Sequence, residues 1–493
     1  MSNPTPEGLP VRAILGWLVA TWALLFVVQL IGPPDLMDND QERPTAYVLD
    51  ALVHGNWIVQ RDSTGDITSK PPFYTWTVAI TAKLFGSFNR FTLYLPGALA
   101  VLGMTLLTFA AGRRAFGPAA GLLAAGLYLL SGTAFKQLVL ARTDAMFALL
   151  VTVAVVLAWR ATHRETHWVW FWIVAALATL TKGPLGLLLA LGGCLAVLWD
   201  RWENREKLLQ SDDEEVILSN LYGLMVYLVI GGLWFYLAWL TAGQALIAKM
   251  IGKELVGHAL QSDGGGRSLL MLPVPFLYFL SRSLPWSLLT IGAIFHLLRR
   301  NFPANPAQRF ALRFAFAQFA VGLLVFSIVP HQRPDHLFPL LPAAAFLGGA
   351  FAAQWITEAR LRRALWLLPA TTILVAGGVV LFNATLRPKE RRVRQTIMVR
   401  DFAREILAKT GNAQPLLHPS GIENPFALQF YLGTMTPHIT PAQAIAALQS
   451  NKPAFVVVRD WDKWRAELRK ADAPDFPWVL QIPKTGNPWL RIV

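Results

Sequence analysis

Long apolar stretches dominate the amino-acid sequence and constrain its fold more than any other feature. The first, AILGWLVATWALLFVVQLIG, is long enough to cross a bilayer as one helix. It lacks the small-residue cleavage site of a removable signal peptide, so we expect it to remain as an anchor. Hydrophobic residues make up 54% of the chain and charged residues 15%, which indicates an integral membrane protein.

Further apolar segments follow, and we predict an α-helical polytopic membrane protein with about 11–13 transmembrane helices. Residues 1–383 are expected to form this transmembrane domain. The predicted spans lie near 12–32, 91–111, 117–132, 143–160, 168–181, 185–199, 218–240, 281–298, 310–329, 335–355 and 364–383.

The basic residues predict which connections face the cytoplasm, because Lys and Arg are favoured in cytoplasmic loops. Threading the spans alternately, with the N-terminus inside, gathers most loop arginines on one side. That side contains Arg113, Arg114, Arg160, Arg164, Arg201, Arg205, Lys207, Arg299, Arg300, Arg360, Arg362 and Arg363. Because cations are dispersed over many short loops, the net charge of +14 favours contact with anionic lipids over nucleic acid.

A second group of polar residues falls on the opposite, exterior side, although its members are far apart in sequence. One site could hold them all. The alternative for each single residue is that it merely ends its own helix at the interface. The group consists of Asp40, Arg43, Lys70, Asp144, Lys182, Glu254, His258, His331 and Arg333.

The loop between the first two spans, residues 33–90, is predicted to contain two interfacial helices. PTAYVLDALVHGNW has Pro44 at a plausible first helical position and ends near Gly55. KPPFYTWTVAITAKLFG predicts a second helix lying along the membrane. Both would hold Asp40 and Lys70 at the level of the headgroups.

The last segment, residues 384–493, is predicted to be a small exported α/β domain. PAFVVVRD is typical of a buried strand, and TIMVRDFAREILAKT and PAQAIAALQS are typical of helices. We find no nucleophile triad, metal cluster or glycine-rich phosphate loop in it. A capping or acceptor-guiding role is therefore favoured over catalysis.

A carboxylate close to several cations suits a transfer reaction whose leaving group is a phosphate. Lys70, Lys182 and Arg333 would bind the phosphate. Asp40 or Asp144 would act as general base or stabilise positive charge developing on a sugar. Since the sequence has no nucleotide-binding fingerprint and the site faces outward, the activated donor is expected to be carried in the lipid.

Several separated motifs resemble the bacterial lipid A aminoarabinose transferases and their protein O-mannosyltransferase relatives, membrane glycosyltransferases of the GT-C fold. The resemblance extends over roughly residues 12–350 and weakens in the C-terminal domain. It is carried by DNDQERPTAYVLDALVHGNW, KPPFYTW, LFGSFNRFTLYLPGALAVLGMTLLTFAAGRRAFG, ARTDAMFALL, LTKGPLGLLL, LPWSLL and HQRPDHLFPLLPA.

This resemblance implies transfer of one sugar from a polyprenyl phosphate to a lipid or protein acceptor on the outer face of a bacterial inner membrane. By position, Asp40 matches the family's first-loop catalytic aspartate and Asp144 a second acidic position. Arg43 matches the basic residue that follows the first aspartate, and Lys70 and Lys182 match positions that meet the donor phosphate. Arg333 lies where the family also approaches the donor.

Two departures alter the charge expected at the site. The family usually has an Asp-Glu pair where this chain has Asp40 and Gln41, and often a Glu where it has Ser69.

Glu254 and His258 resemble an acid and a base of a later exterior loop, and with His331 they form a possible additional site. The four-residue spacing of Glu254 and His258 could support a divalent metal. One Glu-His pair is only half a metal site, so no cofactor is expected.

Two other functions remain open. A transporter or flippase of a lipid-linked sugar would show inverted repeats and ionisable residues near the membrane centre. An inactive relative acting as an assembly partner is kept open by Gln41 and Ser69. The sequence shows no internal repeat, and Asp40 and Lys70 favour an enzyme.

Overall fold

The computed structural model describes most of the chain. The described residues are 10–36, 39–204, 213–250, 252, 271–329, 332–356, 358–409, 416–420, 426–436, 438–450, 454–458, 460–482 and 490–492. Backbone contacts divide the chain into two compact units. The first comprises Met1–Val28, Ser69–Phe73 and Gly97–Gly378, and the second Gln29–Thr68, Tyr74–Pro96 and Val379–Val493.

Every regular element among the described residues of the first unit is a helix. Three helices have residues in both units: α1 (Val11–Ile31), α4 (Arg90–Phe116) and α19 (Leu367–Thr385). The others are α5 (Pro118–Leu129), α6 (Gly132–Gln137), α7 (Asp144–Thr162), α8 (Trp168–Lys182), α9 (Leu185–Leu191), η1 (Gly192–Cys194), α10 (Leu195–Glu203), α11 (Asp213–Ala242), α12 (Gln244–Leu246), α14 (Val274–Arg282), α15 (Trp286–Leu298), α16 (Pro306–Ile328), η4 (Pro334–Leu340), α17 (Leu341–Ala352) and α18 (Glu358–Ala364).

Eight helical segments of the described chain are long and apolar enough to cross a membrane. Three shorter apolar helices, α5, α8 and α15, also coincide with predicted spans. The prediction of a multi-pass helical membrane protein is therefore confirmed. The predicted span 281–298 is shortened, because Pro285 has no backbone N–H to continue a helix, and α15 begins only at Trp286.

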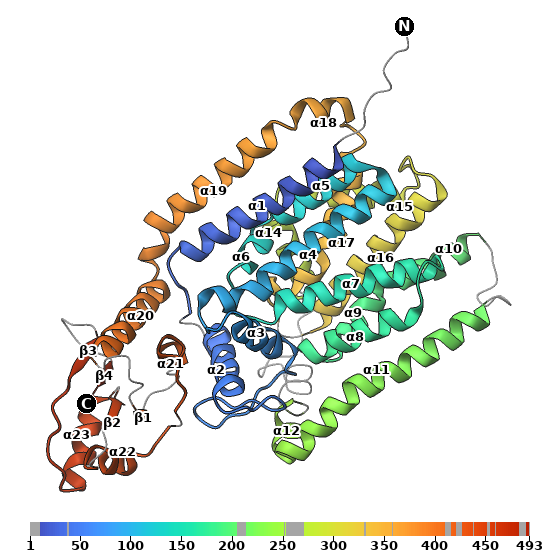
Figure 1. The fold of residues 1–493 in the computed structure, drawn as a ribbon. Coiled ribbons are helices and arrows are strands. Elements are labelled where there is room, and N and C mark those ends of the chain that lie inside the picture. Colours follow the sequence, from blue (N-terminus) through green and yellow to red (C-terminus); the bar gives the residue numbers. More distant parts are fainter. Residues whose placement is uncertain are drawn as a thin grey trace. The chain divides into compact units, whose positions relative to one another are not determined.

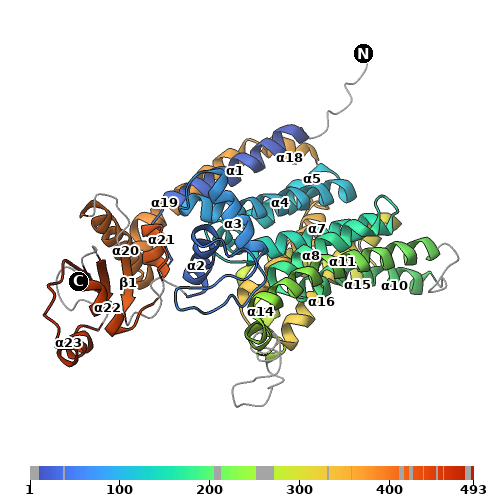
Figure 2. The same cartoon turned by 60° about the horizontal axis from the view of Figure 1, so that its bottom comes forward.

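Helices of the first unit pack closely where small residues meet. α7 and α8 form an antiparallel hairpin, and α8 also packs against α11 (Figure 1; Figure 2). α17 packs against α5 at Gly349, where a Cβ atom would lie only 2.5 Å from the backbone N of Ala124. Only glycine permits this approach, so the two backbones touch without intervening side chains.

Ion pairs mark one end of the first unit. Arg114 and Arg160 both pair with Glu165 in the α7–α8 turn. Arg313 Nη1 lies 2.7 Å from Asp200 Oδ1, and its other nitrogen pairs with Glu203. These contacts bring together turns that the charge pattern assigned to the cytoplasmic side.

In the second unit, the loop after the first span contains α2 (Asn39–Val53) and α3 (Phe73–Leu84). The prediction that a helix begins at Pro44 was wrong, because α2 begins five residues earlier at Asn39. Acidic side chains in the first turn, Asp40 and Glu42, favour this start through the helix dipole. Pro44 lies inside α2 and has no N–H to bond the Asp40 carbonyl, so the second turn of the helix lacks this hydrogen bond.

The C-terminal part of the second unit is a four-stranded sheet with helices on both faces. The strands β1 (Leu416–Ser420), β2 (Ala454–Val458), β3 (Leu480–Ile482) and β4 (Leu490–Ile492) have the order β1-β2-β4-β3. Only β1 and β2 are parallel. The expected strand in PAFVVVRD is β2, and the expected helices are α20 (Arg391–Lys409) and α22 (Pro441–Leu448). η5 (Arg387–Lys389), α21 (Phe426–Leu432) and α23 (Trp461–Lys470) complete the part.

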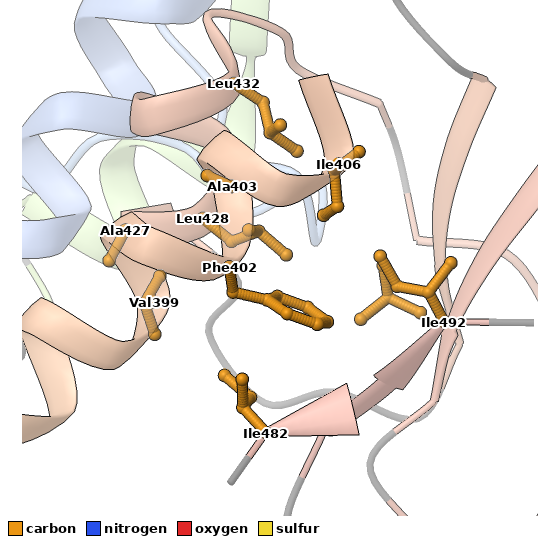
Figure 3. Packing of buried hydrophobic residues seen from close by; sticks show 10 residues of the cluster. Val399, Phe402, Ala403, Ile406, Ala427, Leu428, Leu432, Ile482 and Ile492 are labelled. Carbon is orange, nitrogen blue, oxygen red and sulfur yellow. The ribbon is translucent and has the colours of Figure 1, made fainter. Parts of the chain in front are cut away.

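Alternate residues of β2 are buried in different clusters, which explains its uninterrupted apolar sequence. Val457 packs with Phe402 of α20 and Leu428 of α21 on one face, in the cluster drawn in Figure 3. Val456 and Val458 pack against α22 and α23 on the other. The first loop also packs here, since α2 contacts α21 and the rings of Phe88 and Phe430 lie 5.0 Å apart.

Candidate functional site

The α7–α8 hairpin brings Asp144 and Lys182 into an ion pair. Asp144 is the first residue of α7 and Lys182 the last of α8, so the antiparallel hairpin places both at one end. Each lies where its helix dipole favours its charge. Gly183, at φ 87°, ends α8 directly after the lysine. The motifs ARTD and TKGP, 38 residues apart, thus form one acid–base pair.

Two further basic residues act on the same carboxylate. Lys70 and His336 both interact electrostatically with Asp144. Lys70 is exposed, whereas the side chains of Lys182 and Asp144 retain only 18% and 13% of their accessible surface. The Lys182 ammonium also lies 5.6 Å from the centre of the Phe147 ring. One end of the first unit therefore brings Lys70, Lys182 and His336 to the Asp144 carboxylate.

A second ion-pair network, absent from our sequence predictions, lies at Asp335. Its Oδ2 is 3.1 Å from Arg142 Nη1 and 3.2 Å from Lys136 Nζ. Asp335 lies in η4, two residues after Arg333, which is exposed at the start of that helix. The signal was present in the sequence, since ARTD and QRPDH each carry an acid two residues after an arginine in loops predicted to share one face.

Asp40 and Arg43 belong to the second unit, where both lie in the first turns of α2. Asp40 is exposed. Arg43 Nε lies 3.5 Å from Asp62 Oδ2, and its Nη1 lies 3.8 Å from Asp66 Oδ2. The Asp62 carboxylate is fully buried and accepts a 3.0 Å bond from the backbone N–H of Thr64, which fixes the turn that holds Arg43.

A histidine from the C-terminal part fastens this turn. The backbone N–H of His438 donates a 2.8 Å hydrogen bond to the carbonyl of Ser63. Burial lowers the pKa of the His438 imidazole, and the negative charge of Asp62 opposes this shift without overcoming it. The imidazole is therefore held neutral beside the turn.

An apolar cavity of about 80 Å³ lies deeper in the first unit, between α4, α7, α16 and α17. Thr152 lines it two turns along α7 from Asp144, together with Val155, Phe314 and Phe346. The described residues around it include no titratable side chain, so the cavity is chemically separate from the cationic cluster.

The remaining predicted residues fall outside the described chain. Glu254, His258 and His331 cannot be placed, and the possible additional site stays a prediction. Within the described ranges, no group of three or more His, Cys, Asp or Glu side chains is arranged to hold a metal ion.

Comparisons with known proteins agree with this architecture. Residues 69–211, which include Lys70, Asp144 and Lys182, match the family described as dolichyl-phosphate-mannose-protein mannosyltransferase. An uncharacterized protein of Aquifex aeolicus is 26% identical over 374 residues, which is 73% of this chain and 69% of that protein.

The solved structures extend the likeness to the whole chain. ArnT from Cupriavidus metallidurans bound to undecaprenyl phosphate superposes with a TM-score of 0.72 at 18% identity, over 98% of both chains. Its apo state gives 0.69 at 19% identity, over 97% of this chain and 98% of that one. An oligosaccharyltransferase of Archaeoglobus fulgidus in the apo form gives 0.50 at 13%, over 90% and 69%. The chain therefore has the GT-C fold of the membrane glycosyltransferases.

Proposed function

We propose that the protein transfers a single sugar from a polyprenyl phosphate donor to a lipid or protein acceptor at the exterior face of the inner membrane. The observation that carries this proposal is the group of two lysines and a histidine, Lys70, Lys182 and His336, around Asp144 at one end of a membrane unit. A phosphate leaving group requires such a cluster, and ArnT, whose fold is similar, was solved with undecaprenyl phosphate.

The leaving phosphate is assigned to the cations of the first unit. Lys70 and Lys182 supply point charges and Arg333 a planar fork for its oxygens. The Asp144 carboxylate is already engaged by Lys182, so its role is to hold that lysine in place. In this assignment Asp144 orients the phosphate clamp and takes no proton.

The base is assigned to Asp40. Attack by an acceptor hydroxyl on the anomeric carbon forms the new glycosidic bond and breaks the bond to the phosphate oxygen, with inversion. The acceptor proton passes to the Asp40 carboxylate, and polyprenyl phosphate leaves. Arg43, whose guanidinium pairs with Asp62 and Asp66, is assigned to the donor phosphate. An acceptor that is itself a phosphate would need no strong base.

The test measures release of free polyprenyl phosphate by purified protein in liposomes. The donors are a panel of polyprenyl-phosphoryl sugars, and the acceptors are extracted envelope lipids and proteins. We expect release with one donor, dependent on an acceptor, and lost in Asp40→Asn and in Lys70→Ala. Asp462→Asn and Lys463→Ala, which alter exposed residues of α23, serve as matched controls and retain activity.

Full activity in both Asp40→Asn and Lys70→Ala would remove the proposed site. No release from any donor, by protein that is monodisperse and correctly inserted, would favour a transporter or an inactive relative.

A further inference from the structure

The segment that follows the last apolar helix is strongly basic. Between residues 387 and 394 the chain carries five cations and one acid, Glu390. Arg387 is held internally, because its Nη1 donates to Gln29 Oε1 at 2.9 Å and to Asn383 Oδ1 at 3.2 Å. The other four cations are exposed; they are Lys389, Arg391, Arg392 and Arg394.

The depth of this segment follows from the length of α19. Its 19 residues extend about 28 Å at 1.5 Å per residue, close to the hydrocarbon thickness of a bilayer. Exposed apolar side chains continue into its last turns at Val380 and Leu381 and directly beyond it at Leu386. The first cation follows directly after Leu386, so the basic segment begins at the level of the lipid headgroups.

The packing of α20 directs Arg391 and Arg394 away from the protein interior. Val393 and Val399 are buried, and Thr396 Oγ1 accepts a 3.1 Å hydrogen bond from the backbone N–H of Leu36. These contacts fix the apolar side of the helix against the protein. Arg391 and Arg394 therefore lie on the opposite side of α20, and binding a ligand there requires no rearrangement of the helix.

We infer that this basic segment, residues 387–394, binds the phosphodiester headgroups of anionic phospholipids in the leaflet where α19 ends. Lys and Arg at headgroup depth are attracted to such lipids, and the three exposed cations Lys389, Arg391 and Arg394 exceed what the nearby acid Glu390 can neutralise. The cations Arg360, Arg362 and Arg363 precede α19, so both of its flanks are basic.

The placement of residues 387–394 on the exterior side of the membrane rests on the proposed function. Both flanks of α19 are basic, so only one of them can face the cytoplasm. Basic loops are expected on the cytoplasmic side of a span. A basic segment on the exterior side therefore opposes the usual distribution, and binding to a ligand accounts for it.

The test compares two triple variants of the full-length protein in neutral detergent. Lys389→Gln, Arg391→Gln and Arg394→Gln are combined in the first. The matched control combines Lys463→Gln, Arg469→Gln and Lys470→Gln, three exposed cations of α23. Each protein is titrated with phosphatidylglycerol and separately with phosphatidylcholine while its melting temperature is followed.

Phosphatidylglycerol is expected to raise the melting temperature of the wild type and of the control variant. This increase should be smaller at high salt. Phosphatidylcholine is not expected to raise the melting temperature of either protein. The first triple variant should bind phosphatidylglycerol on the order of a hundredfold more weakly. An undiminished shift in this variant, or an equal shift with phosphatidylcholine, would overturn the inference.

A second readout guards against misfolding of the triple variant. Arg391→Lys combined with Arg394→Lys keeps the charge and should keep the melting-temperature shift with phosphatidylglycerol. Native mass spectrometry should show fewer retained phosphatidylglycerol molecules only in the first triple variant, in which the three cations are replaced by Gln. Equal retention in all variants contradicts the inference. No sugar donor is present, so the result is independent of transferase activity.

Discussion

The Asp144–Lys182 pair permits a quantitative test of how the first unit is held together. Replacing Lys182 by Met leaves the Asp144 carboxylate largely buried without its direct partner. Breaking a fully buried pair costs about 3–5 kcal/mol. Since 13% of the Asp144 side chain is exposed and Lys70 and His336 still act on it, we expect a smaller loss. The expected loss for Lys182→Met is about 2 kcal/mol.

The double variant separates the charge from the packing. Asp144→Asn combined with Lys182→Met removes both charges and keeps similar volumes, so its free energy of unfolding should return to within about 1 kcal/mol of the wild type. The coupling energy from the complete cycle is then at least about 1 kcal/mol. Reversible unfolding by SDS in mixed micelles measures all four proteins. A coupling energy within about 0.3 kcal/mol of zero would refute the reasoning.

Transfer activity in the same four proteins distinguishes structure from function. We expect the double variant to remain inactive although its stability recovers, because Lys182 is assigned to the donor phosphate. Recovery of both stability and activity would make the pair purely structural.

Three further predictions concern other contacts. Gly349→Ala should destabilise the protein by about 1–3 kcal/mol, because the added Cβ would lie 2.5 Å from the Ala124 nitrogen. Gly126→Ala is the control, since no atom lies within 4 Å of its added Cβ, and it should not destabilise the protein. Thermal denaturation of both variants measures the difference. Asp335→Asn removes the partner of Lys136 and Arg142 and should lower both the melting temperature and the donor affinity. Asp475→Asn, which alters a carboxylate that is 63% exposed, should lower them less. Equal effects of the two variants would contradict this prediction. His438 has a lowered pKa, so its contribution to stability is complete above the unfolded value of about 6.5 and is lost as the pH falls below it. His438→Gln should therefore flatten the fall in melting temperature between about pH 7 and 5, and an unchanged slope would disprove the role of this residue.

The order of the helices could be predicted from the sequence because the bilayer imposes one requirement on every span. A segment must be about 20 residues long and apolar, and its backbone must bond internally. The spans around α7 and α16 illustrate this, since neither needs a partner to be recognised. The start of α2 was misplaced because Pro44 is a strong local signal, whereas the acids at Asp40 and Glu42 favour a start before it.

Pairing of charges depends on which helix ends meet, and the sequence carries only part of that information. Alternate threading placed Asp144 and Lys182 on one side of the membrane. That they bond directly follows from the antiparallel packing of α7 and α8. The pairing of Asp335 with Arg142 and Lys136 was not anticipated, because η4 and α6 are far apart in the chain and no short motif links them.

Composition and periodicity act locally along the chain, so the amino-acid sequence was sufficient to predict a multi-pass membrane protein with a terminal α/β part. Only the tertiary structure decided which charges neutralise one another, that Arg43 is held by a buried Asp62, and that His438 fastens the turn that holds it. These contacts join residues as much as 375 positions apart, and they exist only where packing brings distant backbones within hydrogen-bonding distance.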